Sequence, residues 1–145
     1  MTGSLRGMAQ RFVIIGGGPA GNQAATTAAR LGAEVTLVER DIVGGAAHLL
    51  DCIPSKAMIA TGGAMNDMRR AGSMGLVHVE AELDFEALRA RIAGIEKRLE
   101  GSVRGLLQSQ GVNLLQGTGR VVAPHLVEVT ADDGTTQAIE ADTIV

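Results

Sequence analysis

An apolar run of four residues, Phe12–Ile15, leads directly into a glycine-rich turn, and this feature constrains the fold most strongly. A continuous apolar run is typical of a buried parallel strand. The turn places glycines at positions 16, 18 and 21, the spacing G-x-G-x-x-G. In a dinucleotide-binding unit the first glycine permits a tight turn and the second lets backbone approach a pyrophosphate. The third lets the next helix pack closely on the strand, so we expect Gly16, Gly18 and Gly21 to serve these purposes.

The residues after the turn extend the pattern to strand–turn–helix–strand. Pro19 suits a first helical position, where its missing N–H is harmless, and a face of alanines follows up to a stop at Gly32. Residues 33–38 then form an apolar strand that ends at Glu39, 18 residues after Gly21. A carboxylate at this place accepts hydrogen bonds from an adenosine ribose. The alternative is a turn without a ligand, with Glu39 as a surface acid; a P-loop is excluded because no Lys-Ser/Thr pair follows the glycines.

Length and composition indicate an ordinary globular chain. Its 145 residues suit one domain, and its net charge of −3 without a basic run predicts no nucleic-acid partner. No apolar segment is long enough for a membrane span, and we expect no metal site. The single cysteine, Cys52, cannot form an intramolecular disulfide, so we expect a cytoplasmic location. We interpret Met1–Gln10 as a disordered leader rather than a secretory signal.

The segment around Cys52 leaves alternatives open. Pro54 predicts the start of a helix, which places Cys52 just before a helix N-terminus, where amides favour a thiolate. The alternative is that Cys52 is a small buried hydrophobe and Lys56 a solvated residue of the first turn. Spacing alone does not decide between them.

The middle of the chain predicts helices. Residues 65–75 indicate a helical connector rich in Met, Arg and Gly. Asp84 then predicts the cap of a long helix, whose apolar residues recur at spacings of three and four. This stripe favours a core face, and a partner helix is the alternative. The stripe consists of Phe85, Leu88, Ile92, Ile95, Leu99, Val103 and Leu106.

The last third of the chain predicts strands. Residues 112–115 form a short strand that enters Gly117-Thr118-Gly119. The pattern then changes to period two, and residues 120–123, 125–130 and 136–140 predict a small antiparallel meander. Residues 142–145 begin another apolar strand, and we therefore interpret the sequence as a fragment of a longer protein.

Together the glycine turn, Glu39, the segment from Gly44 to Lys56 and Gly117-Thr118-Gly119 resemble the FAD-binding half of the pyridine nucleotide-disulfide oxidoreductases. The resemblance covers residues 11–145, and the run Cys52-Ile53-Pro54-Ser55-Lys56 makes it specific. Family members carry two cysteines separated by four residues before this run. By that register Ala47 stands in the first position and Cys52 in the second. The pattern Gly-Gly-Ala-Ala at residues 44–47, followed by Asp-Cys-Ile-Pro-Ser-Lys at residues 51–56, resembles the actinobacterial NAD(P)H-quinone dehydrogenases, which lack the redox disulfide.

The resemblance implies an α/β fold: a Rossmann-like FAD-binding domain over residues 11–145, with a parallel sheet, a long helix and an antiparallel meander. The domain would be incomplete, the N-terminal portion of a longer flavoprotein that binds NAD(P)H through a domain beyond Val145. The implied activity is hydride transfer from NAD(P)H to flavin and then to a quinone, by a homodimer when full length. A dihydrolipoyl dehydrogenase-like flavoprotein is one alternative. A non-catalytic FAD-binding fragment is another.

The same resemblance implies roles for individual residues. Lys56 would lie near the flavin N5 as a catalytic cation. Cys52 would face the flavin without a partner, and we do not interpret it as a nucleophile. His48, His78 and His125 match no family motif and are interpreted as structural or surface residues. The residues expected to bind FAD are Gly16, Gly18, Pro19, Ala20 and Gly21 near the pyrophosphate, Glu39 at the ribose, Arg40, Gly44, Gly45, Ala46 and Ala47 along the cofactor, Lys56, and Gly119 at the adenine.

Overall fold

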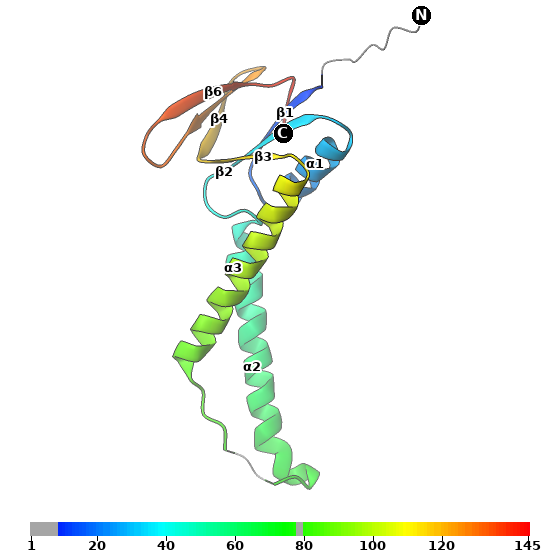
Figure 1. Cartoon of the computed structure of the whole chain (residues 1–145). Coiled ribbons are helices and arrows are strands. Elements are labelled where there is room, and N and C mark those ends of the chain that lie inside the picture. Colours follow the sequence, from blue (N-terminus) through cyan, green and yellow to red (C-terminus); the bar gives the residue numbers. More distant parts are fainter. Residues whose placement is uncertain (1–8, 78–79) are drawn as a thin grey trace, which may run out of the picture.

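A computed structural model describes residues 9–77 and 80–145. A parallel sheet forms its centre, with strand order β3-β2-β1-β7 (Figure 1). These strands are β1 (Arg11–Ile15), β2 (Glu34–Glu39), β3 (Asn113–Gln116) and β7 (Thr143–Ile144). The α/β class and the parallel sheet predicted from the sequence are confirmed.

The two faces of β1 pack against different elements, which explains its continuous apolar run. Ile14 lies in a buried cluster with Ala25 and Ala28 of helix α1 (Pro19–Arg30). Val13 lies in a second buried cluster with Val127 and with other residues of the antiparallel sheet. Because successive side chains of a strand point to opposite faces, a strand covered on both sides must be apolar throughout.

The predicted meander is confirmed as an antiparallel sheet of order β4-β5-β6. Its strands are β4 (Thr118–Ala123), β5 (Leu126–Thr130) and β6 (Thr136–Glu140). In β5 the alternate residues Val127 and Val129 are buried, which is the period-two pattern of a sheet with one covered face. This sheet covers the face of β1 opposite to α1.

Two long helices extend side by side away from the sheets (Figure 1). Helix α2 (Ile53–Arg70) follows a π-helical turn at Ala47–Cys52 and ends in a short 3₁₀ turn, Ala71–Met74. The predicted connector at residues 65–75 is therefore the last part of α2 and this turn. Helix α3 (Phe85–Ser109) begins at the predicted cap, where Asp84 Oδ1 accepts a hydrogen bond from Ala87 N at 2.9 Å.

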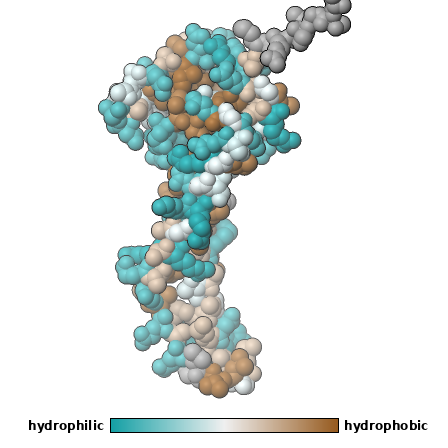
Figure 2. Space-filling view, in the orientation of Figure 1, coloured by the Kyte–Doolittle hydropathy of each residue, from teal (hydrophilic) through white to brown (hydrophobic). Residues whose placement is uncertain are grey.

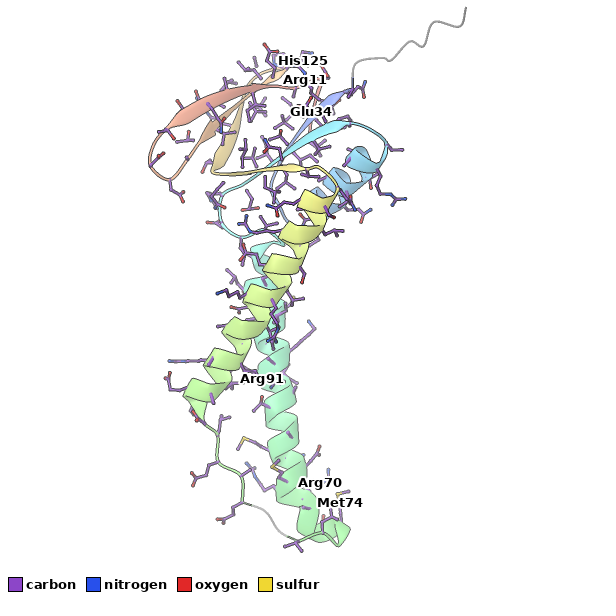
Figure 3. The ribbon with its side chains drawn as sticks, viewed as in Figure 1. Arg11, Glu34, Arg70, Met74, Arg91 and His125 are labelled. Carbon is purple, nitrogen blue, oxygen red and sulfur yellow. The ribbon has the colours of Figure 1, made fainter. Side chains whose placement is uncertain are left out.

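The prediction that the apolar stripe of α3 forms a core face is confirmed only in part. Four residues of the stripe are half-buried, and one of them, Val103, packs against the buried cluster that contains Leu107. Phe85 is 63% exposed and Leu106 is 51% exposed. Only the C-terminal end of α3 reaches the sheet, where the fully buried Leu107, outside the stripe, joins the core. Further exposed apolar residues gather at the far end of the helical pair, beyond Arg70 (Figures 2 and 3). These are Met74, Leu76 and Val77.

The other local expectations have mixed outcomes. The predicted leader falls mostly on residues 1–8, outside the described residues, but Gln10 O accepts a hydrogen bond from Glu34 N at 2.9 Å and so extends the β1–β2 pairing. His125 has the structural role expected of it, with Nδ1 3.0 Å from Ala141 O. His78 and the side chain of His48 lie outside the described part of the chain. No helix in the described ranges has the length and apolarity to cross a membrane.

An ion pair at the start of β1 is expected to make the stability depend on pH (Figure 3 labels Arg11). The backbone N–H of Arg11 donates to Asp142 Oδ2 at 2.8 Å, and its guanidinium lies 3.4 Å from Asp142 Oδ1 and 3.0 Å from Glu140 Oε2. The hydrogen bond from the Arg11 backbone, followed by that from its side chain, lowers the pKa of Asp142 below the usual 3.8. A depressed carboxyl pKa contributes stability above the unfolded-state pKa, and this contribution is lost as the pH falls through the folded-state pKa.

We therefore expect Asp142→Asn to lower the urea midpoint at about pH 6, with the gap to the wild type closing as the pH falls below about 4. Asp67→Asn, on the exposed surface of α2, is the matched control and should leave the midpoint unchanged. A gap of constant size across this pH range would contradict the assignment.

Candidate dinucleotide-binding site

The turn after β1 has a conformation that favours glycine. Gly16 has φ +108°, in a region that residues with a Cβ rarely adopt. Its N–H donates to Val38 O at 2.8 Å, which ties the turn to the end of β2. The chain therefore leaves β1 sharply and enters α1 at Pro19.

Gly18 and Gly21 differ in what a side chain would meet. A Cβ on Gly21 would collide with the carbonyl oxygen of Gly16, so only glycine lets α1 begin this close to the strand. A Cβ on Gly18 would meet no atom within 4 Å, so its open side faces free space. This is the arrangement expected when one glycine serves packing and the other leaves room for a ligand.

Glu39 lies at the end of β2, and its carboxylate reaches the glycine turn. Its Oε2 accepts a hydrogen bond from Gly17 N at 2.6 Å, and its Oε1 accepts one from Asp41 N at 2.7 Å. The contribution of Gly17 is not predicted by the motif, because Gly17 occupies a variable position between the first two motif glycines. The signal was present in the chain order, since parallel β1 and β2 bring their carboxyl ends to one edge of the sheet.

The loop after Glu39 packs against the same turn. Gly44 N donates to Gly17 O at 2.8 Å, and a Cβ on Gly45 would lie 3.0 Å from Gly18 Cα. Both Gly44 and Gly45 have positive φ, +118° and +89°. The backbone of this loop therefore packs directly against the backbone of the glycine turn.

Two clefts border the turn, and most of the predicted site residues line one or the other. One, of about 230 Å³, lies between the ends of β1 and β2 and the start of β4; it is lined by Ile15, Gly16, Val38, Glu39, Arg40, Gly117, Thr118 and Gly119. The other, of about 340 Å³, lies at the start of α1; it is lined by Ile14, Ile15, Gly16, Gly18, Pro19, Ala20, Gly21 and Val145. The structure therefore brings together the predicted glycines, Pro19, Ala20, Glu39, Arg40 and Gly119 around one turn.

The first turn of α1 directs backbone amides at this region. Pro19 has no N–H, and the N–H of Gly17 is bonded to Glu39. At a helix start the next amides, those of Ala20 and Gly21, have no acceptor within the helix. Such amides, together with the helix dipole, favour an anion such as a phosphate.

A family model, pyridine nucleotide-disulphide oxidoreductase, matches residues 10–145. The chain belongs to this family. Its members and its similar proteins are oxidoreductases.

Similar proteins include two kinds of family member. The chain is 37% identical to the NAD(P)H dehydrogenase (quinone) of Mycobacterium tuberculosis, over 95% of this chain and 30% of that protein. It is 41% identical to dihydrolipoyl dehydrogenase 2 of Haloarcula marismortui, over 81% of this chain and 25% of that protein. The crystal structure of LpdA from Mycobacterium tuberculosis matches with a TM-score of 0.82 and 34% identity, over 94% of this chain and 31% of that one. The chain thus spans under a third of the length of these relatives.

Cys52 and Lys56 line neither of the two clefts. Both side chains are exposed. Cys52 has helical dihedrals, φ −69° and ψ −39°, between the π-helical turn and α2. Cys52 lies immediately before α2, as the sequence predicts, but its own backbone is helical because the π-helical turn precedes it. The alternative of a buried hydrophobe is wrong, because Cys52 is exposed.

Ala46 and Ala47 are also exposed, and Ala47 opens the π-helical turn that ends at Cys52. Leu49 anchors this turn, since it is 1% exposed and a Cβ on Gly44 would lie 2.8 Å from its Cδ1. Leu49 therefore holds the turn in which Ala47, the residue that the sequence resemblance aligns with a cysteine, carries only a methyl group. Among the described residues no group of three or more His, Cys, Asp or Glu side chains could hold a metal ion.

Proposed function

We propose that this chain is the FAD-binding part of a flavoprotein that oxidises NAD(P)H and reduces a quinone. The observation that carries the assignment of a dinucleotide is the turn in which Gly21 must lack a side chain and Gly18 leaves open space, with the Glu39 carboxylate beside it. Membership of the family supports FAD as that dinucleotide. The similarity to a protein named NAD(P)H dehydrogenase (quinone) supports the choice of acceptor.

The residues of the two clefts fit a dinucleotide with two phosphates. The amides of Ala20 and Gly21 would hold the pyrophosphate against the open side of Gly18. Glu39 has oxygen lone pairs beyond its two backbone hydrogen bonds and would accept from the adenosine ribose. Gly119, packed on Ile15 and Val38, would border the adenine. The cofactor would extend along Gly44, Gly45, Ala46 and Ala47. Arg40 would lie at the rim of the cleft.

Bound FAD would supply two-electron chemistry between NAD(P)H and the acceptor. Lys56 would supply a positive charge that stabilises negative charge on the reduced cofactor. Cys52 would contribute no electron transfer by itself. A dithiol relay needs two sulfur atoms, and Ala47 removes one of them from the only cysteine pair that the family register allows.

An assay of the full-length protein tests this function. We expect NADH or NADPH oxidation with menadione as acceptor, and turnover with lipoamide near the rate measured with free FAD alone. The reason is that lipoamide reduction proceeds through the missing cysteine pair. Lipoamide turnover at a rate comparable to that with menadione would contradict this proposal and favour the alternative, a dihydrolipoyl dehydrogenase. The similarity to dihydrolipoyl dehydrogenase 2 is the observation that supports this alternative.

Because this chain spans under a third of the length of its relatives, a second test uses the 145-residue chain itself. A flavin absorption spectrum of the purified chain shows whether it retains FAD. If the chain bound FAD and also oxidised NADH unaided, the alternative of a non-catalytic FAD-binding fragment would fail. The homodimer and the cytoplasmic location implied by the sequence resemblance remain part of this proposal for the full-length protein.

A further inference from the structure

Gln116 lies on the strand next to Glu39, the candidate ribose-binding residue. Gln116 is the last residue of β3 and pairs with Glu39 across the β2–β3 register. Its Nε2 donates to Arg40 O at 2.6 Å and approaches Asp41 O at 3.4 Å. Gln116 therefore binds the backbone of the loop that follows Glu39.

Gln116 and Glu39 hold the same peptide group from two sides. The carbonyl of Arg40 and the N–H of Asp41 belong to one planar unit. Gln116 donates to the carbonyl at 2.6 Å, and the N–H donates to Glu39 Oε1 at 2.7 Å. Because the unit is planar, holding both groups fixes the direction in which its N–H points.

The direction of this N–H determines where the Glu39 carboxylate lies. One carboxylate oxygen is bound to Asp41 N, so the other is directed at Gly17 N, 2.6 Å away, at the edge of the cleft. If the peptide group turned, Glu39 would lose the first hydrogen bond and the carboxylate would rotate away from the turn.

Arg104 of α3 fixes the orientation of the Gln116 amide. Its Nη2 lies 3.4 Å from Gln116 Oε1, and its Nε donates to Glu100 Oε1 at 2.8 Å. The opposite amide orientation would place N–H groups against the guanidinium and an oxygen against two carbonyl oxygens. Only the observed orientation satisfies both sides of the amide.

We propose that Gln116 is a positioning residue of the dinucleotide site, which orients the Glu39 carboxylate toward the cofactor ribose through the Arg40–Asp41 peptide group. This inference rests on the proposed function, in which FAD binds at the glycine turn.

A double-mutant cycle on FAD affinity in the full-length protein tests the proposal. Gln116→Glu keeps the size of the side chain but replaces its donor by an acceptor, and we expect the Kd for FAD to rise about fivefold. In a Glu39→Ala background the same substitution should change the Kd by less than about twofold, because no carboxylate remains to be positioned. Gln108→Glu makes the same chemical change at an exposed position of α3 and should leave the Kd unchanged.

Each result of the cycle decides between the proposals. Equal effects of Gln116→Glu with and without Glu39 would indicate a general structural role and overturn the positioning role. Wild-type protein that does not bind FAD would instead overturn the proposed function and this inference together. If Gln116→Glu does not fold, Gln116→Ala removes the donor without adding charge, and the same non-additivity with Glu39→Ala is expected.

Discussion

Gly21→Ala is expected to destabilise the protein by about 3 kcal/mol or more, because the added methyl group has no space. Its Cβ would collide with the carbonyl oxygen of Gly16 and would lie 3.4 Å from Ile14 Cγ2. Both neighbours are fixed, since one is backbone and the other belongs to a residue only 1% exposed. To relieve the collision, α1 would have to move away from β1 and open the cluster that contains Ala25 and Ala28.

The measurement is the urea midpoint of Gly21→Ala against Gly101→Ala. Gly101 is exposed on α3, and a Cβ there would meet no atom within 4 Å. The same substitution at Gly101 should therefore stabilise the protein by about 1 kcal/mol, since alanine favours a helix over glycine. Equal midpoints for Gly21→Ala and the wild type would show that α1 does not contact the strand as closely as described.

Gly18→Ala is expected to spare the fold and to weaken FAD binding about tenfold or more. Gly18 has φ −71° and ψ −177°, which alanine adopts readily, and a Cβ there would contact no protein atom. The methyl group would instead occupy the space in which a pyrophosphate would approach the backbone.

FAD titration of the apoprotein, followed by flavin fluorescence, gives the affinity, and thermal unfolding of the same sample gives the stability. The pairing with Gly21→Ala separates the two uses of glycine, since one variant should fail to fold well and the other should fold but bind poorly. Unchanged FAD affinity in a folded Gly18→Ala variant would place the phosphates elsewhere.

The first βαβ unit could be predicted from the sequence because its determinants are local. The apolar run, the glycine spacing, Pro19 and Gly32 each restrict the backbone within a few residues of themselves. The resulting elements, β1, α1 and β2, lie within a residue or two of the expected positions. The clustering of Glu39 with the turn followed from parallel pairing, which also could be anticipated.

The helical pair could not be predicted in the same way. The periodicity of α3 shows which residues share a face but says nothing about what covers that face. In the structure only Leu107 and its neighbours reach the sheet, while Phe85 lies at the distant end of the helix. The hydrogen bonds of Gln116 were likewise beyond sequence reasoning, because they depend on side-chain orientation across β3, α3 and a loop.

The backbone hydrogen bonds of Gly17 affect the entropic cost of ligand binding at the turn. Its N–H is bonded to Glu39 and its carbonyl to Gly44 N, so both backbone groups are engaged within the protein. Fixing the backbone of one flexible residue costs about 1–2 kcal/mol, and glycine loses more freedom than any other residue. These bonds make that loss part of folding, so the dinucleotide of the proposed function would meet a turn whose shape is already set. The Glu39 carboxylate and the loop at Gly44 therefore preorganise the turn, which would lower the entropic cost of binding a dinucleotide there.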